Sequence, residues 1–173
     1  QQHGNEYRSG SGEPGPAYWQ NRADYQITAS LDDTKNEVKG SVTLTYKNNS
    51  PHNLPFLWFQ LDQNLFNTKS RGFAKISPTG RSRYGDSKSP FEGGYIISSV
   101  KIISTSGGKT VETNVDPIIT DTRMQIMLKK ALQAKGDVVK VKIDYAYTVP
   151  EYGADRTGIL KTAGGNIYAI AQW

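Results

Sequence analysis

Strict alternation of apolar and polar residues constrains the fold of this chain more than any other feature. Every second position from 139 to 149 is aliphatic or aromatic: Val139, Val141, Ile143, Tyr145, Tyr147 and Val149. Side chains two residues apart lie on one face of a β-strand, whereas an α-helix repeats about every 3.6 residues. The pattern therefore predicts a strand with one buried face, which ends at Pro150.

The same two-residue period occurs earlier, on both sides of a polar turn. Four apolar residues would share one face of a first strand: Tyr25, Ile27, Ala29 and Leu31. The polar segment Asp32–Asn36 follows, and the period resumes over residues 38–46. Two alternating segments joined by turn-forming residues predict a β-hairpin.

The most apolar segment of the chain is LPFLWFQLDQNLF, residues 54–66. In an extended chain Leu57 and Leu61 would lie on one face, and Phe56 and Trp58 on the other. Apolar residues on both faces are typical of a strand buried between two layers. We therefore expect this strand to be an inner one, with Trp58 in the core.

Other strand-like segments are residues 95–104, 122–132 and 166–173, whereas 67–91 is expected to be a long loop and 151–165 an irregular stretch. About seven or eight strands without a convincing helix predict an all-β fold. Because hairpins dominate, we expect a mostly antiparallel β-sandwich or a saddle-shaped sheet.

One domain accounts for the 173 residues, of which 1–17 are polar and rich in Gly and Pro. We expect residues 1–17 to be a flexible leader and residues 18–173 to form a single β domain. No apolar run approaches the roughly 18 residues that a membrane span needs. A cleaved secretory segment upstream would make the protein exported, and we expect a periplasmic or extracellular location.

Basic residues cluster in one place only, although the formal net charge is +5. The cluster contains Lys69, Arg71, Lys75, Arg81, Arg83 and Lys88, opposed by Asp86 and interleaved with Phe73 and Tyr84. A groove that stacks single-stranded nucleic acid would use such residues. The alternative is a solvated loop, which we favour because no strand pattern holds these side chains in register. No nucleic-acid partner is therefore expected.

Residues suited to catalysis or metal binding are sparse. The chain has no Cys, and its only histidines, His3 and His52, have no partners at ligand spacing. The acidic pairs Asp32/Asp33 and Asp116/Asp121 are expected to be turn and strand-end residues rather than a glycosidase pair. We therefore predict no catalytic residue, no metal ligand and no cofactor within this chain.

Two stretches resemble a known family when taken together. YQITASLDDTKNEVKGSVTLTYKNNSPHNLPFLWFQLDQNLF, residues 25–66, resembles the opening of the amino-terminal domain of aminopeptidase-N-like zinc metallopeptidases. The residues that match its G-x-x-x-x-x-Y-x-N strand and the end of its next strand are Gly40, Tyr46, Asn48 and Leu61. MQIMLKKALQAKGDVVKVKIDYAY, residues 124–147, is similar to a later pair of strands in the same domain.

The resemblance extends to Ala171-Gln172-Trp173, which fits a family strand that precedes the thermolysin-like catalytic domain. It implies that Gln172 contacts the free amino end of a peptide substrate, because an amide oxygen can accept a hydrogen bond from an ammonium group. It also implies that the chain is a fragment. Zinc and the catalytic residues would belong to a catalytic domain that this domain partners. The docking face is expected to expose Ile167, Ile170 and Trp173 and to promote self-association.

A second class of function stays open. A free-standing exported β-sandwich could bind a carbohydrate or protein ligand, with Trp58, Tyr84 or Tyr152 as stacking surfaces for sugar rings. Sugar binding needs aromatic side chains that are accessible to solvent. Binding of the isolated chain to a glycan array or in an affinity gel would favour this second class.

Overall fold

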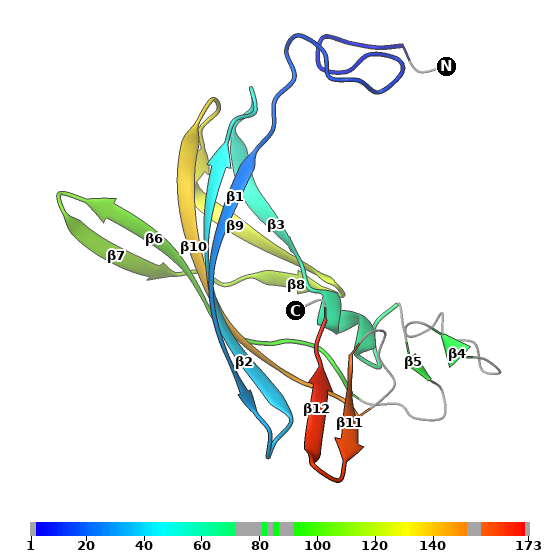
Figure 1. Cartoon of the computed structure of the whole chain (residues 1–173). Coiled ribbons are helices and arrows are strands. Elements are labelled where there is room, and N and C mark those ends of the chain that lie inside the picture. The colour runs from blue at the N-terminus through cyan, green and yellow to red at the C-terminus, as the bar shows by residue number, and fades with distance from the viewer. Residues whose placement is uncertain (1–2, 72–80, 83–84, 87–91, 152–156, 172–173) are drawn as a thin grey trace.

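The computed structural model describes residues 3–71, 81–82, 85–86, 92–151 and 157–171. They form β1 (Arg22–Asp32), β2 (Glu37–Asn48), β3 (Leu54–Gln60), the 3₁₀ helix η1 (Asp62–Phe66), β4 (Arg81–Ser82), β5 (Gly85–Asp86), β6 (Ile96–Ser106), β7 (Lys109–Asn114), β8 (Ile118–Thr120), β9 (Arg123–Leu132), β10 (Asp137–Thr148), β11 (Gly158–Thr162) and β12 (Gly165–Ala169). All pairing between these strands is antiparallel. The predicted all-β, antiparallel fold is confirmed (Figure 1).

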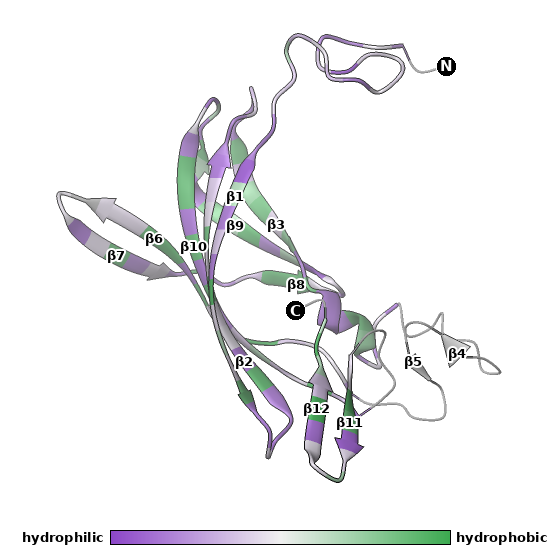
Figure 2. Cartoon of the chain, in the orientation of Figure 1, coloured by the Kyte–Doolittle hydropathy of each residue, from purple (hydrophilic) through white to green (hydrophobic). Residues whose placement is uncertain are grey.

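The larger sheet has the strand order β1-β2-β10-β6-β7. Its first two strands are the predicted hairpin, which pairs from Arg22↔Lys47 to Asp32↔Glu37. β10, which holds the most regular alternation, lies at the centre of the sheet, and Figure 2 shows hydrophobic and hydrophilic residues alternating along it. β10 buries most of one face, including Val141, Ile143 and Tyr147, and so it has the clearest sequence pattern.

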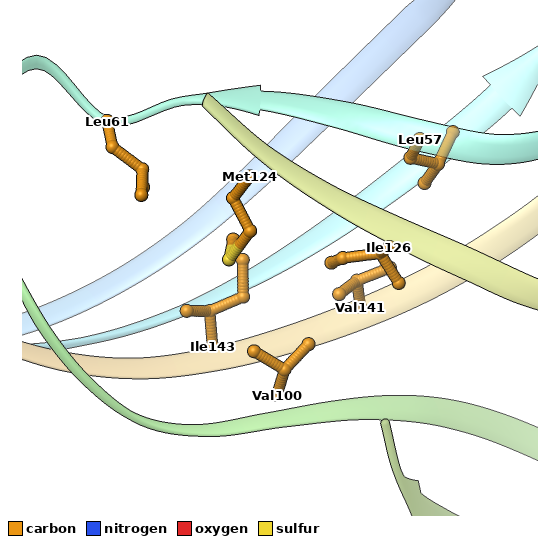
Figure 3. Packing of buried hydrophobic residues seen from close by; sticks show 7 residues of the cluster. All are labelled: Leu57, Leu61, Val100, Met124, Ile126, Val141 and Ile143. Carbon is orange, nitrogen blue, oxygen red and sulfur yellow. The ribbon is translucent and has the colours of Figure 1, made fainter. Parts of the chain in front are cut away.

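The smaller sheet, β3-β9-β8, packs over the centre of the larger one. Side chains from both sheets meet in one cluster, seen in Figure 3: Leu57, Leu61, Val100, Met124, Ile126, Val141 and Ile143. Two antiparallel sheets with interdigitated inner faces form a β-sandwich. The cluster draws on β6 and β10 but not on β1, so the first strand lies outside the core.

The prediction that Trp58 lies in the core is wrong. Its side chain is 55% exposed, although Leu57 beside it is buried. β3 forms one edge of the smaller sheet, and among the described residues only its inner face is covered. The apolar strand ends at Gln60, and the residues after it form η1 rather than more strand.

A second, smaller core joins the β11–β12 hairpin to the end of the larger sheet. Its buried members are Val38, Tyr147, Val149 and Ile159. Tyr168 of β12 donates a hydrogen bond to Asn36 Oδ1 at 2.6 Å, in the turn between β1 and β2. Residues 151–165 were expected to be irregular, but 158–162 pair with β12 as β11, with a turn at Ala163-Gly164.

Residues 3–21 lead into β1 and lie beyond its end in Figure 1. An isolated bridge between Arg8 and Pro14 closes a loop in this stretch. The flexible leader over 1–17 and the single domain over 18–173 stay predictions.

Candidate functional site

Gln172, the residue predicted to contact substrate, lies outside the described residues, but its neighbour Ala171 is held firmly. The Ala171 carbonyl accepts hydrogen bonds from Thr157 Oγ1 at 3.3 Å and from Gln63 Nε2 at 3.4 Å. The Ala171 amide donates to Thr157 Oγ1 at 3.3 Å. Gln63 and Thr157 are both buried. The chain is thus tied to η1 and to Thr157, which directly precedes β11, one residue before Gln172.

η1 is itself fixed between two parts of the sandwich. Asn64 Oδ1 accepts a hydrogen bond from the Tyr95 amide at 2.8 Å, and Asn64 Nδ2 donates to the Asp121 carbonyl at 2.9 Å. Ser70 Oγ donates to Asp121 Oδ1 at 2.7 Å. Because η1 contacts both the entry to β6 and the β8–β9 turn, it gives Ala171 a support with little freedom.

The predicted apolar docking face is present only in part. Ile167 is 57% exposed, as expected. Ile170 instead packs against the second core, because the β11–β12 hairpin folds it back onto the sheet. Trp173 lies outside the described residues.

Lys75, Arg83 and Lys88 of the basic cluster lie outside the described residues, as do Phe73 and Tyr84, whereas Arg81 pairs with Asp86 between the short strands β4 and β5. Lys69 and Arg71 are described, and they line a polar pocket of about 380 Å³. Asp121 lines the same pocket, so it carries charge of both signs. The remaining lining residues are Asn64, Asn67, Ser70, Ile119 and Thr120.

The residues of the two acidic pairs lie in turns or at the ends of strands. Asp32 Oδ1 accepts the backbone N–H of Lys35 at 3.0 Å and of Thr34 at 3.1 Å. These backbone hydrogen bonds, the one from Lys35 first, lower the pKa of Asp32. Asp121 occupies the β8–β9 turn with a φ of 54°, and Asp116 precedes β8. In the part of the chain that is described, no three His, Cys, Asp or Glu side chains converge as metal ligands would.

Three tyrosines stack where the two cores meet. The rings of Tyr145 and Tyr147 are each edge-to-face with Tyr95, at centroid distances of 5.5 Å and 5.6 Å. Burial raises the pKa of all three phenols, so they stay neutral at physiological pH. Tyr147 Oη is buried without a hydrogen-bond partner among the described residues.

An open apolar groove, which sequence reasoning missed, runs between the outer edges of β1 and β3. Its larger part measures about 530 Å³ and the adjoining part about 170 Å³. Tyr25 and Phe59 line both parts, and the exposed Trp58 lines the larger one. The lining also includes apolar residues of both sheets, among them Ile27, Val42, Leu44, Leu54 and Phe56, and the polar residues Asn21 and Gln60. The apolar face of residues 25–31 is the sequence signal for this groove, but the groove can be recognised only once the strand order is known.

The motif residues of the family resemblance hold structural positions. Gly40 of β2 pairs with Tyr145 of β10. A Cβ atom on Gly40 would lie only 2.3 Å from Cζ of the Tyr145 ring, so a larger residue there would require that ring to move. Asn48 is fully buried, and its Nδ2 donates to the carbonyls of His52 at 2.8 Å and Gln133 at 2.9 Å. Tyr46 Oη accepts a hydrogen bond from Asn21 Nδ2 at 2.7 Å.

No protein family and no curated protein matches this sequence. The resemblance to aminopeptidase-N-like zinc metallopeptidases stays a prediction that rests on the residues named for it. Among the described residues, no helix has the length and apolar character needed to cross a bilayer.

Proposed function

We propose that this chain is the non-catalytic amino-terminal β domain of an exported bacterial zinc metallopeptidase of the aminopeptidase-N-like type. One observation carries the proposal. The two stretches that resemble the family, residues 25–66 and 124–147, are distant in sequence but adjacent in the fold, since β2 pairs with β10 and β3 pairs with β9.

The contact between these stretches explains why the G-x-x-x-x-x-Y-x-N strand has a glycine, Gly40, at its first position. Gly40 lies opposite Tyr145, and a side chain at position 40 would displace the Tyr145 ring from its place. Asn48, at the end of the same strand, ties β2 to the turn between β9 and β10. Both motif residues therefore serve the pairing of the two stretches.

In this proposal Gln172 supplies the contact with the substrate. Its neutral amide oxygen can accept a hydrogen bond from the substrate's ammonium group while its NH₂ donates to protein oxygens. The hydrogen bonds of Ala171 to Thr157 and Gln63 would anchor the strand that carries it. The catalytic domain would hold the zinc that activates water, and this domain would fix the polarity of the peptide.

Kinetics of the complete gene product with zinc test this role. Gln172→Ala should weaken the use of an aminoacyl 4-nitroanilide with a free amino group by about 10- to 100-fold in kcat/KM, the effect of losing a hydrogen bond to a charged group. Gln26→Ala, at an exposed position of β1, serves as the matched control and should leave kcat/KM unchanged. Equal kcat/KM values for the wild type and Gln172→Ala would contradict the assigned contact.

An alternative proposal is a free-standing binding module for a carbohydrate or protein ligand. The observation that favours it is Trp58, which is exposed beside an apolar groove, as a sugar-stacking residue must be. Tyr84 and Tyr152 lie outside the described residues. Retardation of the chain in polysaccharide-containing gels, lost in Trp58→Ala, would support this alternative over the first proposal.

A further inference from the structure

β1 is a long sheet edge without the usual protection against pairing. It pairs one-to-one with β2 over its whole length, Arg22 to Asp32, without a register shift or bulge. It contains no Pro and no Lys, and residues 25–31 carry no charge. Bulges, prolines and lysines are the features by which sheet edges avoid joining other strands. No described strand pairs with the outer edge of β1.

The other edges of the two main sheets do carry such features. β7 has Lys109 and Glu112, and β8 is only three residues long. β3 contains Pro55 and a register irregularity beside it. β1 differs from these edges in its length of 11 residues and in residues 25–31, which carry no charge, since its own charged residues lie only near its two ends.

The apolar face of β1 is also uncovered. Tyr25 is 61% exposed and Ile27 is 51% exposed, although both project toward the groove side of the sandwich. Leu31 is exposed as well. An apolar row of this kind beside an open edge favours the addition of another strand, which would supply both backbone hydrogen bonds and apolar contacts.

The sequence of β1 is complementary to a second copy of itself when the two strands run antiparallel with Ile27 opposite Ile27. An antiparallel pair centred there places Arg22 opposite Asp32 of the second copy, twice by symmetry. It also places Tyr25 opposite Ala29 and Ile27 opposite itself, so that large and small apolar side chains alternate on one face. All residues of β1 are paired in this register.

Neighbouring registers are less favourable. A shift of the centre to Thr28 puts Asp24 opposite Asp32, a repulsive pair. A shift of the centre to Gln26 leaves Arg22 opposite Ser30. A slip of one strand by a single residue, by contrast, places the apolar face of one copy opposite the polar face of the other. Charge and pattern together thus select the pairing centred on Ile27.

We propose that the partner of this edge is a second copy of the chain, joined through antiparallel β1–β1 pairing centred on Ile27. The two five-stranded sheets become one continuous sheet across a two-fold axis. The Arg22 side chain, which bonds Asp24 at 2.9 Å within its own chain, is 70% exposed. In the dimer it would pair instead with Asp32 of the other copy, whose Oδ2 lies 3.8 Å from Lys35 Nζ and whose Oδ1 holds the turn. This inference does not depend on the proposed peptidase role.

Single-cysteine variants test the register, because the chain has no cysteine of its own. Directly opposed Cα atoms in an antiparallel pair lie about 4.5–5.5 Å apart, which a disulfide can span. Ile27→Cys should therefore form a covalent dimer on mild oxidation. Ala29→Cys, on the same strand face, would be separated from its own copy by about four residues of strand and should stay monomeric. Val111→Cys, in the β7 edge, should also stay monomeric.

Charge reversal tests the ion pairs by analytical ultracentrifugation. Arg22→Asp alone and Asp32→Arg alone each create like-charge pairs and should weaken dimerisation roughly tenfold. Mixing the two variants restores opposite charges at both ends and should recover the affinity as a heterodimer. Circular dichroism of each variant verifies that the monomer is folded.

Specific results would overturn the proposal. A wild-type chain that keeps the mass of one copy at every concentration tested would do so. A dimer that cross-links through Ala29→Cys or Val111→Cys rather than Ile27→Cys would place the interface elsewhere. Charge-reversal variants whose mixture dimerises no better than either variant alone would contradict the register.

Discussion

Gly40 is the residue whose identity the fold explains most completely. Any Cβ atom there would overlap the ring of Tyr145 across the β2–β10 pair. We expect Gly40→Ala to destabilise the chain by about 1–3 kcal/mol, the usual cost of overpacking a well-packed site. Urea unfolding measures this loss.

A double-mutant cycle separates this clash from a general effect of replacing glycine. When Tyr145→Ala removes the ring, the further change Gly40→Ala should cost much less than it does in the wild type. Additive losses in the double variant would show that the ring is not the cause.

Tyr147 shows the opposite situation, a polar atom that the structure leaves unsatisfied. Its Oη is buried and has no partner among the described residues. Tyr147→Phe should therefore leave the free energy of unfolding unchanged or raise it by about 1 kcal/mol, because burying an unpaired hydroxyl is costly. Tyr46→Phe is the matched control: it removes the acceptor of Asn21 Nδ2 and should lower stability by about 1 kcal/mol. A larger loss for Tyr147→Phe than for Tyr46→Phe would refute this view.

At the scale of elements, Asn48 joins the end of β2 to the β9–β10 turn. Its Nδ2 donates to the Gln133 carbonyl at 2.9 Å, and its Oδ1 accepts from Ser50 Oγ at 2.6 Å. We expect Asn48→Ala to cost about 2–3 kcal/mol, since it leaves several buried groups without partners. Asn53→Ala provides the control, because Asn53 is exposed and makes one bond to the same turn, to the Ala134 amide at 2.8 Å. Equal losses measured in urea for the two variants would contradict a special role for Asn48.

The elements that the sequence predicted well are those whose apolar and polar residues alternate regularly, whether the apolar face is largely buried, as in β10, or exposed, as in β1. β10 and the β1–β2 hairpin were correctly predicted from alternation alone. The burial of Trp58 was predicted wrongly because apolar residues on both faces were taken to mean two covering layers. β11 was missed because its pattern is short, follows Pro150 and Gly153, and itself begins with a glycine, Gly158.

At the scale of the whole molecule, the order of the strands in the sheets determines features, such as the groove, that the local sequence pattern cannot predict. The groove between β1 and β3 exists because both strands lie at sheet edges, and that order depends on β2 pairing with β10, about a hundred residues away. Gln172 as a site residue came from resemblance rather than from any property of its neighbours in sequence. The anchoring of Ala171 by Gln63 involves a contact over 108 positions, which periodicity does not encode.

The central claim is that this β domain belongs to a zinc peptidase whose catalytic domain follows it. Sequencing the coding DNA beyond the codon for Trp173 tests it most directly. The account predicts an in-frame continuation that carries H-E-x-x-H with a further glutamate ligand downstream. A stop codon directly after Trp173 would contradict it and leave the binding-module alternative.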